Sequence, residues 1–210
     1  SLMFAVGLFG VCTLGYNLFT GKVGYFFYNE KKSYTKFLIN VLIGNAIGAI
    51  LIAWLLLLSR NGEFLQEKAL ALVNTKLNDT YLSLFILGIM CNIFVVFGVE
   101  EYKSNPNDLG KYLGIIFAVM VFILAGFEHS VADIFYFAMA GVWTLDGLLR
   151  ILVMNSSSAI VLFFLRMSNL LVGHPLAVIV MMLMFNITLM YLARASYRYV
   201  RTYNMQRQRS

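Results

Sequence analysis

The chain has 210 residues, of which 60% are hydrophobic and only 12% are charged, and its mean hydropathy is +0.79. A soluble domain of this length does not need so much apolar surface, so the composition indicates a membrane protein. The net charge is +6, but the basic residues flank apolar segments and form no single interleaved patch, which argues against nucleic-acid binding. The apolar runs lack the alternation of β-barrel strands, so helical spans are expected.

The first apolar segment, residues 2–28, is expected to be a broken membrane helix. It is uncharged from Leu2 to Thr20, is interrupted by the polar and glycine-containing stretch Asn17–Lys22, and then resumes its apolar character up to Tyr28. Backbone groups that are freed at such a break need partners within the protein, because hydrocarbon offers none.

Two whole spans follow. Phe37–Leu58 contains 22 uncharged residues and Tyr81–Val99 contains 19, and each is long enough to cross about 30 Å of hydrocarbon as a helix. The first of them carries Gly44 and Gly48, a spacing of small residues that lets helix backbones approach closely. In the polar connection between the spans, residues 64–73 are expected to form an amphipathic surface helix.

The fourth segment, residues 112–145, is again expected to be broken. It is uncharged for its first 16 residues, and then Glu128, His129 and Asp133 follow Gly126 within the same apolar stretch. Ionisable groups are costly in hydrocarbon and normally face a partner or a protein-lined path. A polar kink satisfied by neighbouring helices would also fit, but a broken membrane helix with a titratable group in the break is typical of transport. Glu128 is expected to accept hydrogen bonds from amides at the break.

The rest of the chain is expected to contain one more span. Residues 143–166 are interpreted as an interfacial or re-entrant piece, residues 167–193 are uncharged over 27 positions and are interpreted as the last span, and residues 194–210 form a basic tail. The whole of 1–210 is therefore interpreted as a single transmembrane domain.

Lysine and arginine are unevenly divided between the two sides that these spans define. Eleven lie on the side of the tail and five on the opposite side. The positive-inside bias therefore places the C-terminus in the cytoplasm, in a multi-pass protein of the cell or inner membrane.

The order of the segments suggests an internal repeat. Broken, whole, whole, broken and whole segments fit two halves of three helices, each with its second helix broken. Halves with an odd number of spans insert with opposite topology, which gives an inverted repeat. The opening helix of the first half is then expected to be missing from this chain, before Ser1.

Three segments closely resemble signature segments of the formate–nitrite transporter family. They are Leu18-Phe19-Thr20-Gly21, Gly88-Ile89-Met90-Cys91-Asn92 and Gly126-Phe127-Glu128-His129-Ser130-Val131-Ala132, and Gly44-Asn45 matches as well. The resemblance extends over residues 2–140. It implies an aquaporin-like fold of six helices per protomer, a homopentamer with one pore in each protomer, and permeation of small monovalent anions such as formate, nitrite, hydrosulfide or lactate, or of their conjugate acids.

The resemblance also implies roles for individual residues. His129 is similar to the family's central pore histidine, Thr20 to its hydrogen-bonding partner, Lys76 to the vestibule lysine, and Asn92 to the polar residue of the fourth helix. The family's apolar constrictions are expected at Phe4, Leu8, Leu18, Phe19, Val95 and Phe122. The chain departs from the family in having Asn17 where an acidic residue is usual and Asp133 where asparagine is common.

A mechanism follows from the cost of moving charge through such a pore. An anion cannot pass between phenylalanine and leucine side chains while charged, because desolvating an isolated ion costs many kcal/mol. A weak acid avoids that cost by taking up a proton. Lys76 would raise the anion concentration outside, and His129 could donate or relay the proton, or merely hydrogen-bond the permeant.

Two other classes of function remain open at this point. An aquaporin-like channel for small neutral solutes would conduct independently of pH. An intramembrane enzyme would need a second catalytic group or a metal ligand near His129, where only Glu128 and Asp133 are available, so no enzyme activity, metal or cofactor is expected. The sequence favours a channel or transporter for weak-acid anions and protons, embedded in the lipid bilayer.

Overall fold

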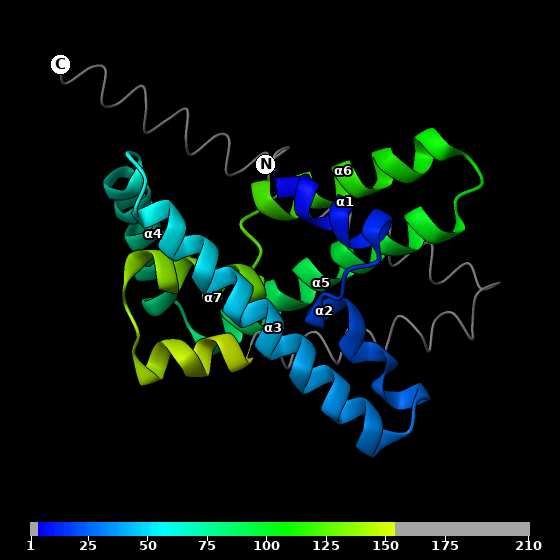
Figure 1. Cartoon of the computed structure of the whole chain (residues 1–210), viewed down its shortest axis with the longest axis horizontal. Coiled ribbons are helices and arrows are strands. Elements are labelled where there is room, and N and C mark those ends of the chain that lie inside the picture. The colour runs from blue at the N-terminus through cyan, green and yellow to red at the C-terminus, as the bar shows by residue number, and fades with distance from the viewer. Residues whose placement is uncertain (1–3, 154–210) are drawn as a thin grey trace.

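The computed structural model describes residues 4–153, and every regular element in that range is helical (Figure 1). Residues 145–153 are helical as well. The expected all-helical fold is thus confirmed, whereas the spans and tail expected beyond residue 153 lie outside the described residues. The elements in chain order are α1 (Ala5–Leu14), α2 (Phe19–Lys22), the 3-10 helix η2 (Val23–Tyr28), α3 (Lys31–Leu57), α4 (Gly62–Leu77), α5 (Tyr81–Ser104), α6 (Asp108–Leu124) and α7 (Ser130–Ala140).

Two of the described helices, α3 and α5, are long and apolar enough to cross a membrane. Both continue beyond the uncharged runs of the sequence, α3 at its N-terminal end and α5 at its C-terminal end. Side-chain caps explain where they begin: Glu30 accepts hydrogen bonds from the amides of Lys32 and Ser33, and Thr80 accepts one from the amide of Ser83. Such caps satisfy amide groups that have no partner within the helix.

The first helix interruption lies at residues 15–18. Gly15 ends α1 with a φ of 71°, a left-handed conformation that only glycine adopts at little cost, and Leu18 is extended. The sequence placed the interruption at Asn17–Lys22, and this was wrong for residues 19–22, which are helical.

A side chain of α3 explains the early return of the helix. Asn45 Oδ1 accepts a hydrogen bond from the amide of Phe19 at 2.9 Å, and Asn45 Nδ2 donates one to the carbonyl of Asn17 at 3.0 Å. The backbone groups that the break frees are therefore satisfied within the protein, as an apolar environment requires.

The second interruption uses the same device. α6 ends at Leu124, and Gly126 follows with a φ of 69°. The chain then runs through Phe127 and Glu128 to His129, which is extended and stands at the N-terminal end of α7. The amide of Glu128 donates to the carbonyl of Leu87 in α5 at 3.4 Å, which ties the break to that helix.

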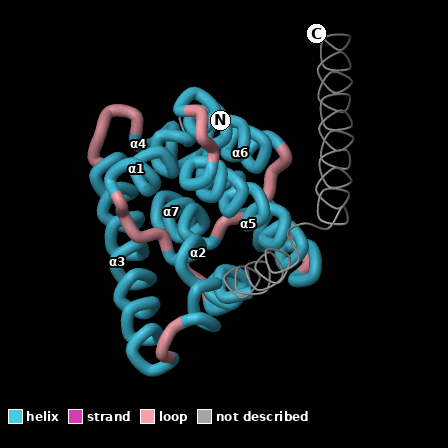
Figure 2. Tube along the Cα trace, turned by 90° about the vertical axis from the view of Figure 1, so that its right-hand side faces the viewer, coloured by secondary structure: helices cyan, strands magenta, loops and turns pink. Residues whose placement is uncertain are grey.

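The helix α7 is enclosed by the other elements, packing against α3, α4 and α2 (Figure 2). One apolar cluster joins α7 to α3, α4 and the start of α5, and includes Ala53, Val73, Leu84 and Phe137. A second joins α1 to α5 and α6. α5 contributes to both, so the two broken segments are held against one continuous helix.

The connection between the spans forms a longer helix than expected. The sequence predicted an amphipathic helix over residues 64–73, and α4 extends over Gly62–Leu77. Its buried residues Ala69, Val73 and Lys76 follow helical spacing and face the core, while Phe64 is 61% exposed. The extra turn at the C-terminal end brings Lys76 into the protein interior.

The glycines of α3 do not have the predicted packing role within the described chain. A Cβ atom added at Gly44 or at Gly48 would have no neighbour within 4 Å. Both glycines line an open cavity, and this leaves room in the cavity where a side chain would project.

Candidate pore and its buried histidine

A cavity of about 440 Å³ lies between the two broken segments and α3. Phe4, the N-cap of α1, lines it together with Leu8 and Val11 of that helix, at positions spaced by four and three residues. The other lining residues are Gly7, Leu18, Gly44, Asn45, Gly48, Ala49, Ile52, Val95, Val119, Phe122, His129, Val131, Ala132 and Phe135. Among residues 4–153, His129 and Asn45 contribute the only polar side chains to this wall, so the cavity is a predominantly apolar passage past one imidazole.

Five of the six residues expected at apolar constrictions line this cavity: Phe4, Leu8, Leu18, Val95 and Phe122. The rings of Phe4 and Phe122 lie edge to face, with centroids 5.8 Å apart and an interplanar angle of 83°. The Phe122 ring lies 6.3 Å from the His129 ring.

Phe19 is the exception among the expected constriction residues. It does not line the cavity, and its amide is capped by Asn45.

The structure brings the two broken segments together at His129 and Thr20. Thr20 Oγ1 lies 3.0 Å from His129 Nε2, although the two residues are 109 positions apart in the sequence. Thr20 is 1% exposed and His129 is 8% exposed. Thr20 lies in the first turn of α2 and His129 caps α7, so this hydrogen bond joins the two helix ends.

The second ring nitrogen of His129 defines the tautomer. The amide of Ala132 donates to His129 Nδ1 at 3.3 Å, so Nδ1 must carry a lone pair. The proton of the neutral ring is then on Nε2, which donates to the hydroxyl oxygen of Thr20. Protonating Nδ1 would place its N–H against the N–H of Ala132 and remove the cap of α7. The geometry therefore favours a neutral imidazole whose Nε2–H points toward Thr20.

Asn92 is buried but does not line this cavity. Its Nδ2 donates to the carbonyl of Gly88 at 2.6 Å, one turn earlier in α5. Its Oδ1 is buried and has no hydrogen-bond partner among the described residues. A buried amide oxygen without a partner is uncommon in folded proteins, and it leaves Asn92 with an acceptor available.

Lys76 lies in a buried ionic cluster with two carboxylates. Its Nζ forms ion pairs with Glu128 Oε2 and with Asp133 Oδ1, the second at 2.9 Å, and all three residues are buried. The Tyr136 ring lies 5.7 Å from Nζ. Two carboxylates and one ammonium carry one net negative charge when all three are ionised. Lys76 therefore does not make this region positive, and it does not line the cavity.

This cluster corrects the expected role of Glu128. The sequence predicted that the Glu128 carboxylate accepts hydrogen bonds from amides at the helix break. Its side chain pairs with Lys76 instead, and the cap at the start of α7 is His129. The reason is burial: a carboxylate in the interior needs a full opposite charge, and α4 supplies one.

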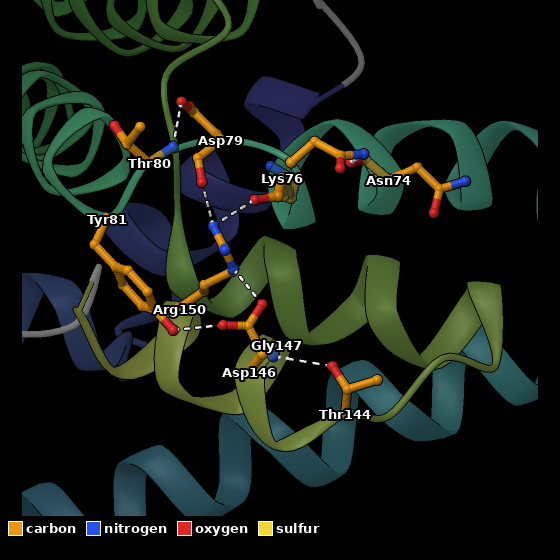
Figure 3. Close-up of polar contacts among 10 residues, drawn as sticks. Asn74, Lys76, Asp79, Thr80, Tyr81, Thr144, Asp146, Gly147 and Arg150 are labelled. Carbon is orange, nitrogen blue, oxygen red and sulfur yellow. Dashed lines mark hydrogen bonds and ion pairs between the residues drawn. The ribbon is translucent and has the colours of Figure 1, made fainter.

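Arg150 fixes the end of α4 next to this cluster (Figure 3). Its Nη1 donates to the carbonyls of Lys76 at 3.0 Å and Asp79 at 2.5 Å, and its Nε donates to Asp146 Oδ2 at 2.7 Å. Its guanidinium also lies 4.7 Å from the centroid of the Tyr81 ring, and the Tyr81 hydroxyl donates to Asp146 Oδ1 at 2.5 Å. Carbonyl groups at the end of α4 are thus held by a cation, in the orientation that stabilises a helix C-terminus.

The sequence analysis assigned no contact to three residues of this region: Asn45, Asp133 and Arg150. Asn45 belongs to a glycine–asparagine pair that matched the family, but no hydrogen-bond partner was expected for it. Asp133 lies four residues after His129, on the first turn of α7, a spacing that places both on one side of the helix. Arg150 has no signal in the sequence, because its hydrogen-bond partners other than Asp146 are more than 70 positions away.

The described residues thus form a set of helices, two of them interrupted, around a predominantly apolar cavity. Two solved structures are similar to this chain in fold. One is an FNT family ion channel, with a TM-score of 0.67 and 23% sequence identity, in an alignment that covers 82% of this chain and 75% of that chain. The other is a pentameric formate channel with formate bound, with a TM-score of 0.64 and 26% identity, covering 82% and 81%.

The chain belongs to the formate/nitrite transporter family, whose sequence profile matches residues 1–173. It is therefore an integral membrane protein. An uncharacterized transporter of Bacillus subtilis (strain 168), YrhG, is 35% identical over 143 residues, which are 63% of this chain and 53% of that protein. The formate channel FocA of Escherichia coli (strain K12) is 31% identical over 107 residues, 48% of this chain and 37% of that protein. The chain thus matches about half or less of these relatives' lengths.

Proposed function

We propose that this protein is a channel or transporter for small monovalent anions of weak acids, of the formate, nitrite, hydrosulfide and lactate class, and that they pass as the neutral acid. The observation that carries the proposal is the pair of His129 and Thr20 beside a cavity whose wall is otherwise almost entirely apolar. Membership of the formate/nitrite transporter family supports the class of permeant.

The apolar wall decides the charge state of the permeant. Transferring a charged carboxylate from water past Phe4, Phe122 and Leu18 would cost many kcal/mol. As the surroundings lose polarity, the pKa of the permeating acid itself rises, and the acid takes up a proton before it reaches the narrowest part. Only the neutral form then crosses the apolar wall, and one proton moves with each permeant.

His129 acts in this scheme as a hydrogen-bond donor. Its Nε2–H already points to a hydroxyl oxygen, and a carboxylic acid or nitrous acid oxygen can take the place of Thr20 as the acceptor. A proton relay would require protonation of Nδ1, which accepts the amide of Ala132. Hydrogen bonding to the permeant therefore explains the geometry with no rearrangement of the α7 cap.

The ionic cluster of Lys76, Glu128 and Asp133 has a supporting role. It holds a carboxylate that lies next to His129 in the sequence and keeps it paired with an ammonium. An unpaired negative charge there would repel anions that approach the cavity. The role of Lys76 is therefore to compensate negative charge next to the helix break that carries His129.

The assembly and orientation follow the family and the charge distribution. We infer a homopentamer with one pore in each protomer, supported by the likeness to a pentameric formate channel. The C-terminus and the Lys22 side of the protein face the cytoplasm, because eleven of the sixteen basic residues lie on that side. The two glycine-ended breaks, at Gly15 and Gly126, are the corresponding positions of an inverted repeat within an aquaporin-like fold.

Substitution of His129 tests the donor role. His129→Asn keeps an acceptor for the amide of Ala132, because asparagine is a good N-cap, and keeps an amide N–H as donor. We expect it to retain proton-coupled formate uptake into proteoliposomes, reduced by less than about tenfold, which is the cost of roughly one weakened hydrogen bond. His129→Leu removes both functions and abolishes uptake. Equal loss in both variants would contradict the donor role and favour a proton relay, and full uptake in His129→Leu would contradict any role of this residue.

A further inference from the structure

A second cavity lies beyond the first, and we call it the inner vestibule. It has a volume of about 200 Å³ and is bounded by α1, the break after it, α2, η2 and the C-terminal end of α5. The residues that define it for this purpose are Cys12, Leu18, Lys22, Tyr25, Val99 and Lys103.

The two cavities follow one another along a single path. Leu18 and Val11 line both of them, so these two side chains form the wall between the cavities. On α5, Val95 lines the first cavity, which His129 also lines and which we call the histidine cavity, whereas Val99 and Lys103 line the inner vestibule. These positions are spaced by four residues and therefore lie along one face of the helix. A permeant leaving His129 past Leu18 enters the inner vestibule next.

The charged groups that line the inner vestibule are both lysines. Lys103 Nζ is positioned by the Tyr25 hydroxyl at 2.9 Å and by Glu100 Oε1 at 3.2 Å, and it lies 5.5 Å from the centroid of the Tyr25 ring. Lys22 has no ion-pair partner within residues 4–153. None of the described residues contributes a carboxylate to the lining of this cavity. Even with Glu100 compensating Lys103, the vestibule carries one uncompensated positive charge.

We propose that the inner vestibule is an anion-binding site, in which Lys22 and Lys103 hold a small monovalent anion such as a short carboxylate or nitrite on the cytoplasmic side of Leu18. The identity of the anion rests on the proposed function, whereas the existence of the site rests on the cavity and its two lysines. A concave site of one sign of charge raises the local concentration of ions of the opposite sign. The anion waits there in its charged form and enters the apolar passage after protonation.

The lysines of the inner vestibule differ from Lys76, which is buried between two carboxylates and lines neither cavity. Because the inner vestibule keeps an ammonium that is not compensated, its lysines are available to an anion and Lys76 is not.

Cys12 provides a measurement that does not depend on transport. It lines the vestibule and is partly exposed, whereas Cys91, the other cysteine, is fully buried. The rates at which an anionic methanethiosulfonate and its cationic analogue modify Cys12 are compared in detergent-solubilised full-length protein. The ratio of the two rates cancels the ionisation of the thiol, which affects both reagents equally. We expect the anionic reagent to react faster, and Lys22→Gln and Lys103→Gln each to lower the ratio by about threefold or more at low ionic strength.

Controls separate a binding site from a general surface charge. Lys36→Gln removes the same charge from the same side of the protein without touching the vestibule, and Lys22→Arg keeps the charge, so both should leave the ratio unchanged. Cys12→Ser gives the background, and thermal unfolding of each variant reports its folding. Sodium formate should slow modification of Cys12 more than sodium gluconate of equal ionic strength, and this protection should disappear in Lys22→Gln/Lys103→Gln.

The outcomes that overturn the proposal are distinct from failure of the proposed function. A ratio that both vestibule substitutions leave unchanged, or that Lys36→Gln lowers equally, overturns the site. Absence of selective protection by formate overturns its assignment as an anion-binding site. Lysine-dependent protection in a protein that shows no formate flux in proteoliposomes would sustain the site and reject the proposed transport.

Discussion

At the scale of single residues, His129 and Lys76 show how this protein places polar groups in an apolar interior. His129 uses one ring nitrogen to accept from the amide of Ala132 and the other to donate to Thr20, so it caps a helix and presents a donor at once. Lys76 is held by two carboxylates from the neighbouring break and helix. Burial of such groups is tolerable only because each has partners.

The charge imbalance in the Lys76 cluster predicts opposite effects for two substitutions. Lys76→Met leaves Glu128 and Asp133 buried without a cation, and we expect it to destabilise the fold by about 3–5 kcal/mol. Asp133→Asn leaves one carboxylate for one ammonium, so stability should be unchanged or higher. The measurement is the thermal unfolding midpoint of the purified protein at neutral pH.

A control on the same helix shows whether the effect belongs to the cluster. Lys68 is exposed on α4, so Lys68→Met should change the unfolding midpoint very little. If Asp133→Asn lowers the midpoint as much as Lys76→Met does, the second carboxylate does not leave the buried cluster with an unfavourable excess of negative charge. Our description of the cluster would then be wrong.

Some contacts of this site could be predicted from the sequence, and others could not. The pairing of Thr20 with His129 follows from a resemblance whose motifs contain both residues. The ion pairs of Lys76 join residues 52 and 57 positions apart through the packing of α4 on α7, and no local pattern encodes that contact. The tautomer of His129 depends on the backbone conformation of the α7 N-terminus, which a sequence does not specify.

At the scale of elements, the two breaks are built alike. Each contains a glycine in the left-handed region just after the preceding helix, and each is followed by a helix whose N-terminal end carries a residue of the His129–Thr20 pair. The sequence indicated both interruptions from their polar and glycine content. It misplaced the first because the helix restarts at Phe19, where Asn45 of α3 supplies the cap.

The glycine at the second break provides a test of this geometry. Gly126 has a φ of 69° and no atom within 4 Å of a Cβ added there, so Gly126→Ala introduces backbone strain without a steric clash. We expect a loss of about 1–2 kcal/mol in the free energy of unfolding, measured by denaturation in detergent.

The comparison variant is Gly44→Ala in α3, where a Cβ also meets no neighbour. It should leave stability unchanged or slightly higher, because alanine favours the helix, while its methyl group projects into the histidine cavity and slows permeation. Equal stability of Gly126→Ala and Gly44→Ala would argue against a left-handed glycine at the break.

The end of α4 predicts an acid-dependent loss of stability. Hydrogen bonds from the Tyr81 hydroxyl and the Arg150 guanidinium lower the pKa of Asp146 below its ordinary value. A carboxyl group with a lowered pKa in the folded state stabilises the fold fully above its unfolded pKa, and this contribution disappears as the pH falls through the folded pKa. Asp146→Asn should therefore narrow the difference between unfolding midpoints measured at neutral and acidic pH.

The matched control for this measurement is Asp108→Asn, which removes an exposed carboxylate that pairs with Lys111 three residues away in α6. Its pH dependence should remain close to that of the unmodified protein. An Asp146→Asn variant with undiminished acid sensitivity would show that the contacts in Figure 3 do not contribute to stability at the end of α4.

At the scale of the whole molecule, the described residues form a path with three parts. An aromatic pair lies at one end, a histidine that donates a hydrogen bond lies within an apolar wall, and a lysine-lined vestibule lies beyond Leu18. Composition and hydropathy were sufficient to predict an all-helical membrane protein, because long uncharged runs have few other solutions. They were insufficient for the vestibule, because its lysines come from two helices that meet only in the folded chain.

Flux measured across imposed pH gradients shows whether the permeant crosses as a neutral acid. The protein is reconstituted into liposomes, protein-free liposomes provide the background, and uptake of formate, nitrite and lactate is followed at several external pH values and one internal pH. Our account predicts that protein-dependent uptake of each anion rises as the external medium becomes more acidic, and that collapsing the pH gradient lowers it. Uptake of every anion that is independent of pH would contradict the account and favour a channel for neutral solutes or for bare anions.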